Sequence, residues 1–359
     1  MIKILTIVGA RPQFIKAAVV SKQLRIRCIN EEIIHTGQHY DYNLSTIFWD
    51  ELNIPQPTIN LNVGSSRHGE QTGLMIQKIE EYIFLMNHKP NALMVYGDTN
   101  STLAGAIVAS KIHIPIIHIE AGLRSFNRNM PEEINRILTD HISELLFCSS
   151  EVGVNQLKKE NIHGTIFNVG DVMYDAFLTF SEISKKKSAG KEFLKQLDNE
   201  FYLATIHRPS NTDNPRNLSS IIRAFSELGK QVIWPLHPRN KNKLSEYELP
   251  SNLLVIPPQS YFDMNALLRN CKKVLTDSGG LQKEAYWAKK PCITIREETE
   301  WIETLHGNWN QLTGPNSSKI ISAMSQNPYT KWTPLYGIGE SSIAIAENIL
   351  NTFTSHNNF

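Results

Sequence analysis

The chain has 359 residues, 41% of them hydrophobic and 20% charged, and its formal net charge at neutral pH is +1. This balance argues against nucleic acid or an anionic membrane surface as a partner. No apolar run approaches the length of a membrane span, and the first run, Ile4–Val8, is too short for a signal-peptide core, so we expect a cytoplasmic protein. The length exceeds that of one compact core and predicts two domains.

Cysteine and histidine usage gives no sign of disulfides or of a bound metal. The four cysteines, Cys28, Cys148, Cys271 and Cys292, show no C-x-x-C spacing, and the twelve histidines include no H-E-x-x-H motif. Three of the cysteines lie in or beside apolar segments, where a reduced thiol packs as a small hydrophobic residue. We therefore expect no metal site.

Short apolar runs alternate with helix-like segments along the whole chain. We predict a first series of strands at Lys3–Val8, Glu32–Thr36, Ala92–Tyr96, Pro115–Ile119, Leu145–Cys148 and Thr165–Val169. A second series follows at Tyr202–Ile206, Gln231–Pro235, Leu253–Ile256, Lys273–Thr276 and Pro291–Ile295. Predicted helices include Thr99–Lys111, Glu132–His141, Asn217–Leu228 and Gly280–Ala288. This alternation predicts parallel, doubly wound sheets in two Rossmann-like α/β domains. We place the domains at 1–170 and 171–340, with a helix at 341–359 that can pack back on the first domain.

Almost every predicted strand delivers a polar or charged residue at its carboxyl end. Open α/β sheets bind their ligands outside these ends. We therefore expect the two domains to share a ligand-binding cleft. The strand-end candidates are Arg11, Gln38, His39, Asp98, Glu120, His207, Arg208, Gln259 and Arg296.

The densest group of charges follows the fourth predicted strand. Glu120 and Arg124 come directly after it, and a proline with two acids behind it predicts a helix start that carries Glu132 and Arg136. Two acids and two arginines suit an anionic substrate whose protons must be moved. The alternative is that the acids complement the helix dipole and that Arg136 is their surface partner.

A second candidate loop, Asp277–Gly280, lies between a predicted strand and an amphipathic helix. Gly279 and Gly280 let a ligand approach the backbone closely, and the free N–H groups of the helix start after Ser278 favour a phosphate. Glu284, one turn into the helix, can reach a ribose diol. The alternative is a plain N-cap, Asp or Ser. The chain has no G-x-G-x-x-G and no P-loop motif, which disfavours a dehydrogenase and an ATPase.

Three further candidates also have ordinary alternatives. Asp98 is either a functional carboxylate or the N-cap of the following helix. Lys16 lies in a largely apolar helix and either points into the cleft or is a surface lysine with a packed stem. His207, beside Arg208, is either structural or placed to neutralise phosphate charge or move a proton.

Taken together, the polar segments resemble the non-hydrolysing UDP-N-acetylglucosamine 2-epimerases. The matching segments are VGARPQFIK (8–16), TGQH (36–39), YGDTNST (96–102), HIEAGLR (118–124), PEEINR (131–136), TIHRP (205–209) and TDSGGLQKEA (276–285). The resemblance implies two facing Rossmann-like domains like those of the GT-B glycosyltransferases, a UDP-sugar in the cleft between them, and a homodimer.

The resemblance also implies roles for the candidate residues. Catalysis would fall to Asp98, Glu120, Glu132 and His207. Substrate binding, with UDP held mainly by the second domain, would fall to Arg11, Lys16, Gln38, His39, Arg124, Arg136, Arg208, Gln259, Ser278, Gly279, Gly280, Glu284 and Arg296. A carboxylate would remove the C2 proton of the sugar as UDP leaves C1, and UDP would then add back to the 2-acetamidoglucal as a proton reaches the opposite face of C2. This route requires neither a cofactor nor a metal.

The chain departs from the common family pattern at Tyr40, in the stretch His68–Gly73, and at Trp301, where many members have arginine. The last two features look like the branch that includes epimerases of UDP-2,3-diacetamido-2,3-dideoxy-glucuronic acid. The substrate is therefore either that uronate or UDP-N-acetylglucosamine. A GT-B glycosyltransferase fits less well, because the three carboxylates would have less to do.

Overall fold

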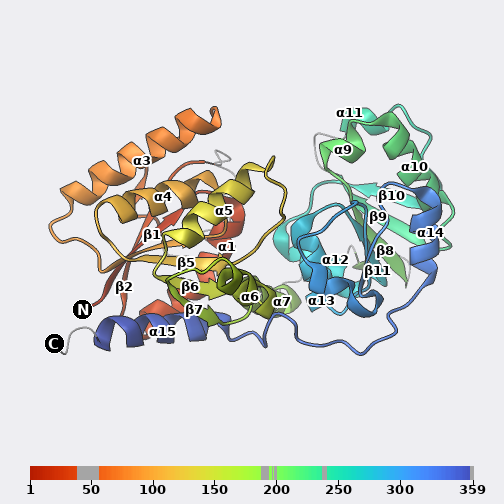
Figure 1. The fold of residues 1–359 in the computed structure, drawn as a ribbon. Helices are drawn as coiled ribbons and strands as arrows, with labels where there is room; N and C mark the ends of the chain where they lie inside the picture. The colour runs from red at the N-terminus through yellow and green to blue at the C-terminus, as the bar shows by residue number, and fades with distance from the viewer. Residues whose placement is uncertain (39–55, 187–193, 196, 198–199, 237–240, 356–359) are drawn as a thin grey trace. The chain divides into compact units, whose positions relative to one another are not determined.

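The computed structural model describes residues 1–38, 56–186, 194–195, 197, 200–236 and 241–355. The chain divides into two compact units, which Figure 1 colours from red at the N-terminus to blue at the C-terminus. Unit 1 comprises Met1–Ala176 and Tyr336–Phe359, and unit 2 comprises Phe177–Leu335. No helix among the described residues is long and apolar enough to span a membrane.

Unit 1 is built on one parallel sheet whose strands run in the order β3-β2-β1-β4-β5-β6-β7. The strands are β1 (Lys3–Val8), β2 (Asn30–His35), β3 (Ile59–Asn60), β4 (Ala92–Tyr96), β5 (Ile116–Ala121), β6 (Leu145–Cys148) and β7 (Thr165–Asn168). Each residue of β4 is buried, which matches its unbroken apolar sequence and is typical of a strand covered on both faces. The strand order reverses between β1 and β4, so a ligand is expected at the carboxyl ends of these two strands.

The helices of unit 1 bury the sheet. They are α1 (Arg11–Ile26), α3 (His68–Leu85), α4 (Asn100–Lys111), α5 (Pro131–His141), α6 (Glu151–Lys159), α7 (Val172–Lys186, which continues into unit 2) and α15 (Ser341–Ser355). Apolar residues of α3 and α4 pack with Ile7 and Val95 of the central strands. The C-terminal helix α15 runs along α1 (Figure 1), and Arg27 after α1 donates to Glu347 at 2.7 Å.

Unit 2 repeats the same plan with the strand order β10-β9-β8-β11-β12-β13, again all parallel. Its strands are β8 (Phe201–Thr205), β9 (Gln231–Pro235), β10 (Leu253–Ile256), β11 (Lys273–Thr276), β12 (Cys292–Thr294) and β13 (Asn310–Leu312). Its helical segments are α9 (Pro209–Thr212), α10 (Pro215–Ser226), α11 (Lys241–Leu244), α12 (Tyr261–Asn270), α13 (Gly279–Trp287), η2 (Ile302–Asn308) and α14 (Ser317–Ser325). The order reverses between β8 and β11.

The core of unit 2 explains why its helices form where they do. Helix α10 begins after Asn214, whose side chain accepts hydrogen bonds from two backbone N–H groups of the first turn, and Pro215 occupies the first helical position. The helix then buries Phe225 against Trp234 of β9, with ring centroids 5.9 Å apart in an edge-to-face arrangement.

The structure confirms the parallel α/β architecture and all eleven predicted strands, and no strand end differs from its predicted position by more than two residues. Two strands, β3 and β13, were not predicted, because runs of two and three residues at a sheet edge carry no periodic signal. The units change at Ala176 and Leu335, whereas the sequence placed boundaries after residues 170 and 340, and α15 belongs to unit 1.

Candidate functional site

In unit 1, a buried glutamine joins the two strands at the switch point. Gln13, in the first turn of α1, accepts from the backbone N–H of Gly9 at 2.7 Å and of Ala10 at 3.0 Å. Its amide donates to the Tyr96 carbonyl, at the end of β4, at 2.7 Å. This side chain therefore holds the loop after β1 against the end of β4, directly before Asp98. Gln13 is not among the predicted site residues, although it lies in the VGARPQFIK segment.

Asp98 is not the N-cap of the following helix. That place is taken by Thr99, whose side chain accepts from the Thr102 N–H at 3.3 Å. The Asp98 carboxylate instead pairs with the Arg136 guanidinium from α5, and 30% of the Asp98 side chain is exposed. The structure therefore leaves Asp98 at a strand end, paired with a cation and partly open to solvent.

Arg136 is buried, not a surface residue, although it does contact an acid one turn earlier in α5. Its second nitrogen lies 3.3 Å from Glu133, only 1% of which is exposed. Glu133 also accepts from the Ser125 N–H and hydroxyl and from the Phe126 N–H, each at 2.9 Å. Glu133 thus fixes both Arg136 and the loop before α5. The pair of acids at the helix start was visible in the sequence, but which of them faces inward was not.

Glu120 lies at an irregularity of β5. The pairing register with β6 shifts between Ile119 and Ala121, and Glu120 itself has φ of 72°. Such bulges redirect a side chain and occur often beside functional sites. The redirected carboxylate pairs with Lys16 of α1, which is buried and so is not a surface lysine. A Cβ placed on Gly97 would lie 3.3 Å from the Glu120 carboxylate, so Glu120 and the Asp98 turn are neighbours.

Arg124 does not join this group. Its guanidinium donates to Asp140 at 2.7 Å and makes two bonds to Glu160, at 2.8 and 2.6 Å, and 2% of its side chain is exposed. Asp140 also accepts from His118, a fully buried histidine of β5, at 2.7 Å. These contacts hold Arg124 between two acids, and the substrate contact predicted for it stays a prediction.

The other predicted residues of unit 1 lie around the same strand ends. Arg11 is half-buried in the first turn of α1. The Gln38 amide oxygen accepts from the Ser101 hydroxyl at 2.6 Å, at the start of α4. Glu132 is half-buried in the first turn of α5. His39 lies outside the described residues.

In unit 2, a buried carboxylate organises the switch point. Asp277 follows β11, is fully buried, and accepts from the backbone N–H groups of His207 at 3.0 Å and Arg208 at 2.9 Å, and from the Asn211 amide at 3.0 Å. The His207 ring lies 3.5 Å from the same carboxylate, and 44% of its side chain is exposed. Asp277 therefore holds the TIHRP turn and orients His207. From the sequence, Asp277 belonged to the candidate phosphate loop, with a plain N-cap as the alternative, and its contact with the TIHRP turn was not predicted.

The N-cap of α13 is Ser278, whose hydroxyl accepts from the Leu281 N–H at 3.4 Å. The two glycines of this turn differ. A Cβ on Gly280 would meet nothing within 4 Å, whereas one on Gly279 would lie 3.0 Å from a Glu300 oxygen. Glu284 follows one turn later and is half-buried. The helix start thus has open space at Gly280, while the side next to Gly279 is covered by the segment after β12.

Two arginines bring positive charge to this turn. Arg296 pairs with Glu300 at 2.9 Å, and burial, followed by the charge of Arg296, lowers the pKa of Arg208. Trp301 fixes the covering segment, because its indole N–H donates to the Gly279 carbonyl at 3.0 Å. Two guanidinium groups close enough to repel each other, beside a helix N-terminus, form a site suited to a polyanion.

Gln259 lies before α12, and its amide donates to the Pro257 carbonyl at 2.7 Å.

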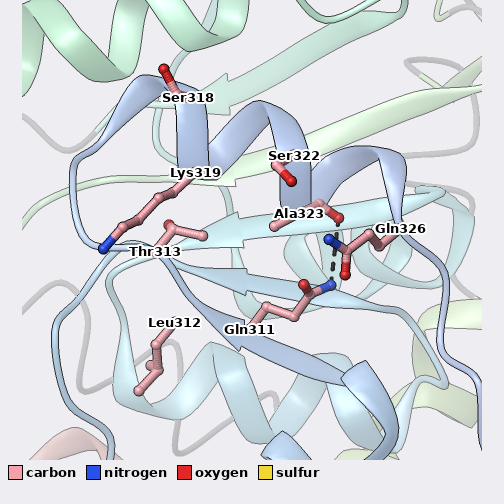
Figure 2. Close-up of a pocket in the computed structure, with 8 residues that line it drawn as sticks. All are labelled: Gln311, Leu312, Thr313, Ser318, Lys319, Ser322, Ala323 and Gln326. Carbon is pink, nitrogen blue, oxygen red and sulfur yellow. Dashed lines mark hydrogen bonds between the residues drawn. The ribbon is translucent and has the colours of Figure 1, made fainter.

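A separate pocket of about 310 Å³ opens between β13 and α14 of unit 2 (Figure 2). It contains none of the predicted site residues and is lined by Gln311, Leu312, Thr313, Ser318, Lys319, Ser322, Ala323 and Gln326. Among the residues that the structure describes, no three His, Cys, Asp or Glu side chains come together as metal ligands.

A family model described as UDP-N-acetylglucosamine 2-epimerase matches residues 22–350 of this chain. The chain belongs to that family. A UDP-N-acetylglucosamine 2-epimerase homolog of Methanococcus maripaludis is 51% identical over 97% of this chain and 99% of its own. The UDP-2,3-diacetamido-2,3-dideoxy-D-glucuronate 2-epimerase of Pseudomonas aeruginosa is 47% identical over 96% of this chain and 98% of its own. Both branches considered from the sequence are therefore represented among its relatives.

Solved structures of family members have the same fold. The Methanocaldococcus jannaschii UDP-GlcNAc 2-epimerase, crystallised with UDP-GlcNAc and UDP, superposes with a TM-score of 0.86 at 41% identity, over 98% of this chain and all of that one. The Neisseria meningitidis enzyme bound to UDP-GlcNAc gives a TM-score of 0.87 at 28% identity over the same shares. These matches confirm the predicted GT-B-like fold class and the epimerase family.

Proposed function

We propose that this protein is a non-hydrolysing 2-epimerase that interconverts UDP-N-acetylglucosamine and UDP-N-acetylmannosamine. The observation that carries the proposal is the pairing in unit 1. Two carboxylates, Asp98 and Glu120, lie at the ends of adjacent parallel strands, and each has its own cation, Arg136 or Lys16. Inversion at C2 requires proton transfer on two faces of one carbon, and two separately held acid–base groups meet that requirement.

Unit 2 would bind the nucleotide. The diphosphate would accept hydrogen bonds from the N–H groups at the start of α13, with Arg208, Arg296 and His207 supplying positive charge. The open space at Gly280 permits a close approach to the backbone. Glu284 would accept from the ribose hydroxyls. These groups stabilise the charge that develops on UDP as the bond between C1 and the phosphate oxygen breaks.

Unit 1 would handle the protons. One carboxylate takes the C2 proton, the electron pair of the C–H bond forms the C1–C2 double bond, and UDP leaves with the pair of the C1–O bond. UDP then adds back to C1 as an acid delivers a proton to the other face of C2. Asp98, Glu120 and Glu132 are the candidates, and the proposal leaves open which acid serves which face.

Deuterium exchange tests the reaction. UDP-N-acetylglucosamine is incubated with the protein in D2O, and proton NMR follows the reaction. The C2 proton should be replaced by deuterium, and the manno epimer should appear. We expect a loss of about two orders of magnitude in rate, the usual size of an acid–base contribution, in each of Asp98→Asn, Glu120→Gln and Glu132→Gln. The affinity for UDP should stay unchanged. Glu227→Gln, at a surface ion pair, is the matched control. Near wild-type turnover in all three variants would refute the assignment of the carboxylates.

The relative from Pseudomonas aeruginosa supports a second substrate, UDP-2,3-diacetamido-2,3-dideoxy-glucuronic acid. The same exchange experiment with this uronate decides between the two. Exchange with the uronate alone would transfer the assignment to that substrate and leave the elimination mechanism unchanged.

We also propose that the protein is a cytoplasmic homodimer. Helices α3 and α5, which both pack against α4, leave several large apolar side chains exposed, which are Leu74, Phe84 and Leu85 on α3 and Ile134 and Leu138 on α5. A second copy of the chain would bury such a face. Light scattering after gel filtration should give twice the chain mass for the wild type and a monomer for Leu138→Glu. A wild-type monomer would exclude the dimer. Four unpaired cysteines are consistent with a reducing compartment.

A further inference from the structure

We propose that His118 is a positioning residue for this reaction, because its ring joins the two strand ends that carry Asp98 and Glu120 to helix α5. The inference rests on the proposed function. His118 touches neither of the two carboxylates and would act through the backbone that presents them.

The His118 ring bridges three elements. It lies in β5, two residues before Glu120, and is fully buried. Its Nε2 atom lies 2.7 Å from the carbonyl of Gly97, the residue before Asp98 at the end of β4. Its Nδ1 atom lies 2.7 Å from Asp140, in the last turn of α5. One side chain therefore connects the turn that holds Asp98, the strand that holds Glu120 and the helix that holds Arg136.

Both nitrogens of the His118 ring face hydrogen-bond acceptors, so the ring donates from both. A backbone carbonyl can only accept, so Nε2 must carry a proton. On the other side, Asp140 also accepts from the Gly122 N–H at 3.2 Å and from Arg124 at 2.7 Å. Burial would raise the pKa of Asp140, but the hydrogen bonds and charges of His118 and Arg124 hold it below its ordinary value. Asp140 is thus an ionised acceptor, and Nδ1 faces it as a donor.

The bridge acts at two backbone positions with positive φ. Gly97 has φ of 64°, which glycine adopts without steric cost, whereas Glu120 has φ of 72°, a region that non-glycine residues rarely adopt and that persists only where the surroundings enforce it. The His118 ring hydrogen-bonds to the Gly97 carbonyl, and Glu120 lies two residues after His118 in β5. We infer that the bridge sets the distance between the Asp98 and Glu120 carboxylates, and that its loss leaves the acids present but displaced.

Two substitutions separate positioning from folding. His118→Gln offers one amide donor group where the ring reaches two acceptors, and Asp140→Asn removes one carboxylate oxygen at constant size. Each variant should lower kcat about 10- to 100-fold, the effect of a displacement of about 1 Å at a reacting group. KM and the dissociation constant of UDP should change less than about threefold, because the proposed nucleotide site in unit 2 is unaltered. His88→Gln, at an exposed histidine, is the control and should match the wild type.

The outcomes are distinct. Folded variants with wild-type kcat, or with losses confined to KM, would overturn the role of His118. Should the substitutions prevent folding, the wild-type protein carries the test. Its histidine ring spectrum by 15N NMR should contain one ring with two hydrogen-bonded N–H protons that shift when the UDP-sugar is added, and the absence of such a ring, or of the shift, would overturn the proposal. Lack of C2 exchange in the wild type would instead refute the proposed function.

Discussion

Replacement of Asp277 by asparagine should destabilise unit 2, because one oxygen of this buried carboxylate accepts from both the Arg208 N–H at 2.9 Å and the Asn211 amide at 3.0 Å. In Asp277→Asn, one side-chain oxygen becomes an NH2 group, so that position can no longer accept either bond. Each hydrogen bond to a charged group contributes about 1.5–3 kcal/mol, so the two together give a loss of about 3–6 kcal/mol. The His207 N–H keeps an acceptor at 3.0 Å. For a unit of this size, the loss corresponds to a fall in Tm of about 6–24 °C.

Urea unfolding followed by tryptophan fluorescence measures this effect, because five of the six tryptophans lie in unit 2. The same variant should bind UDP more weakly in calorimetry, since the turn that presents His207 and Arg208 loses its anchor. Asp213→Asn is the matched control. It breaks a partly exposed surface pair with Lys243 and should cost at most about 1 kcal/mol. A free energy of unfolding in Asp277→Asn within about 1 kcal/mol of the wild type would refute the reasoning. The loss of one acceptor that serves two buried donors should lower this free energy by more than that.

Gly280→Ala should stabilise the protein by about 0.5–1 kcal/mol, since a Cβ meets nothing within 4 Å at this helical position, yet weaken UDP binding in calorimetry if the phosphates approach there. Glu133→Gln should cost about 1.5–3 kcal/mol and raise hydrogen exchange in the loop at positions 125 and 126, and unchanged protection would contradict the role of this acid. Burial raises the pKa of Cys271 and of Cys292 to about 12. Their contribution to stability is therefore complete below the unfolded thiol value of about 8.5 and is lost as pH rises toward 12, so the urea midpoint should fall between pH 8 and pH 10 more steeply than in a variant with alanine at both positions. Only Cys28 is exposed among the cysteines, so a thiol reagent should modify one cysteine of the native chain and four in urea.

The sequence by itself determined the architecture and the neighbourhood of the site. The pattern of buried strands and amphipathic helices depends on residues close together in the chain, so all eleven predicted strands are found in two sheets of Rossmann order. In each such sheet the carboxyl ends of the strands lie along one edge, which is why the polar residues after β4 and β5, and those after β8 and β11, could be grouped from the sequence. The motif segments then predicted the family.

The tertiary structure alone decided which charged groups face one another. Arg124 and Arg136 are equivalent in the sequence, each a few residues from an acid, but Arg136 pairs with Asp98 whereas Arg124 is buried between Asp140 and Glu160. Asp277 had the sequence context of a helix cap, yet it holds a turn about 70 residues away in the chain. Such partners are separated by 16 to 70 residues and are fixed by how strand ends, a bulge and helix starts pack. Burial of a charged group is tolerated only when a partner is present, so the fold selects the pairing among several that the sequence allows.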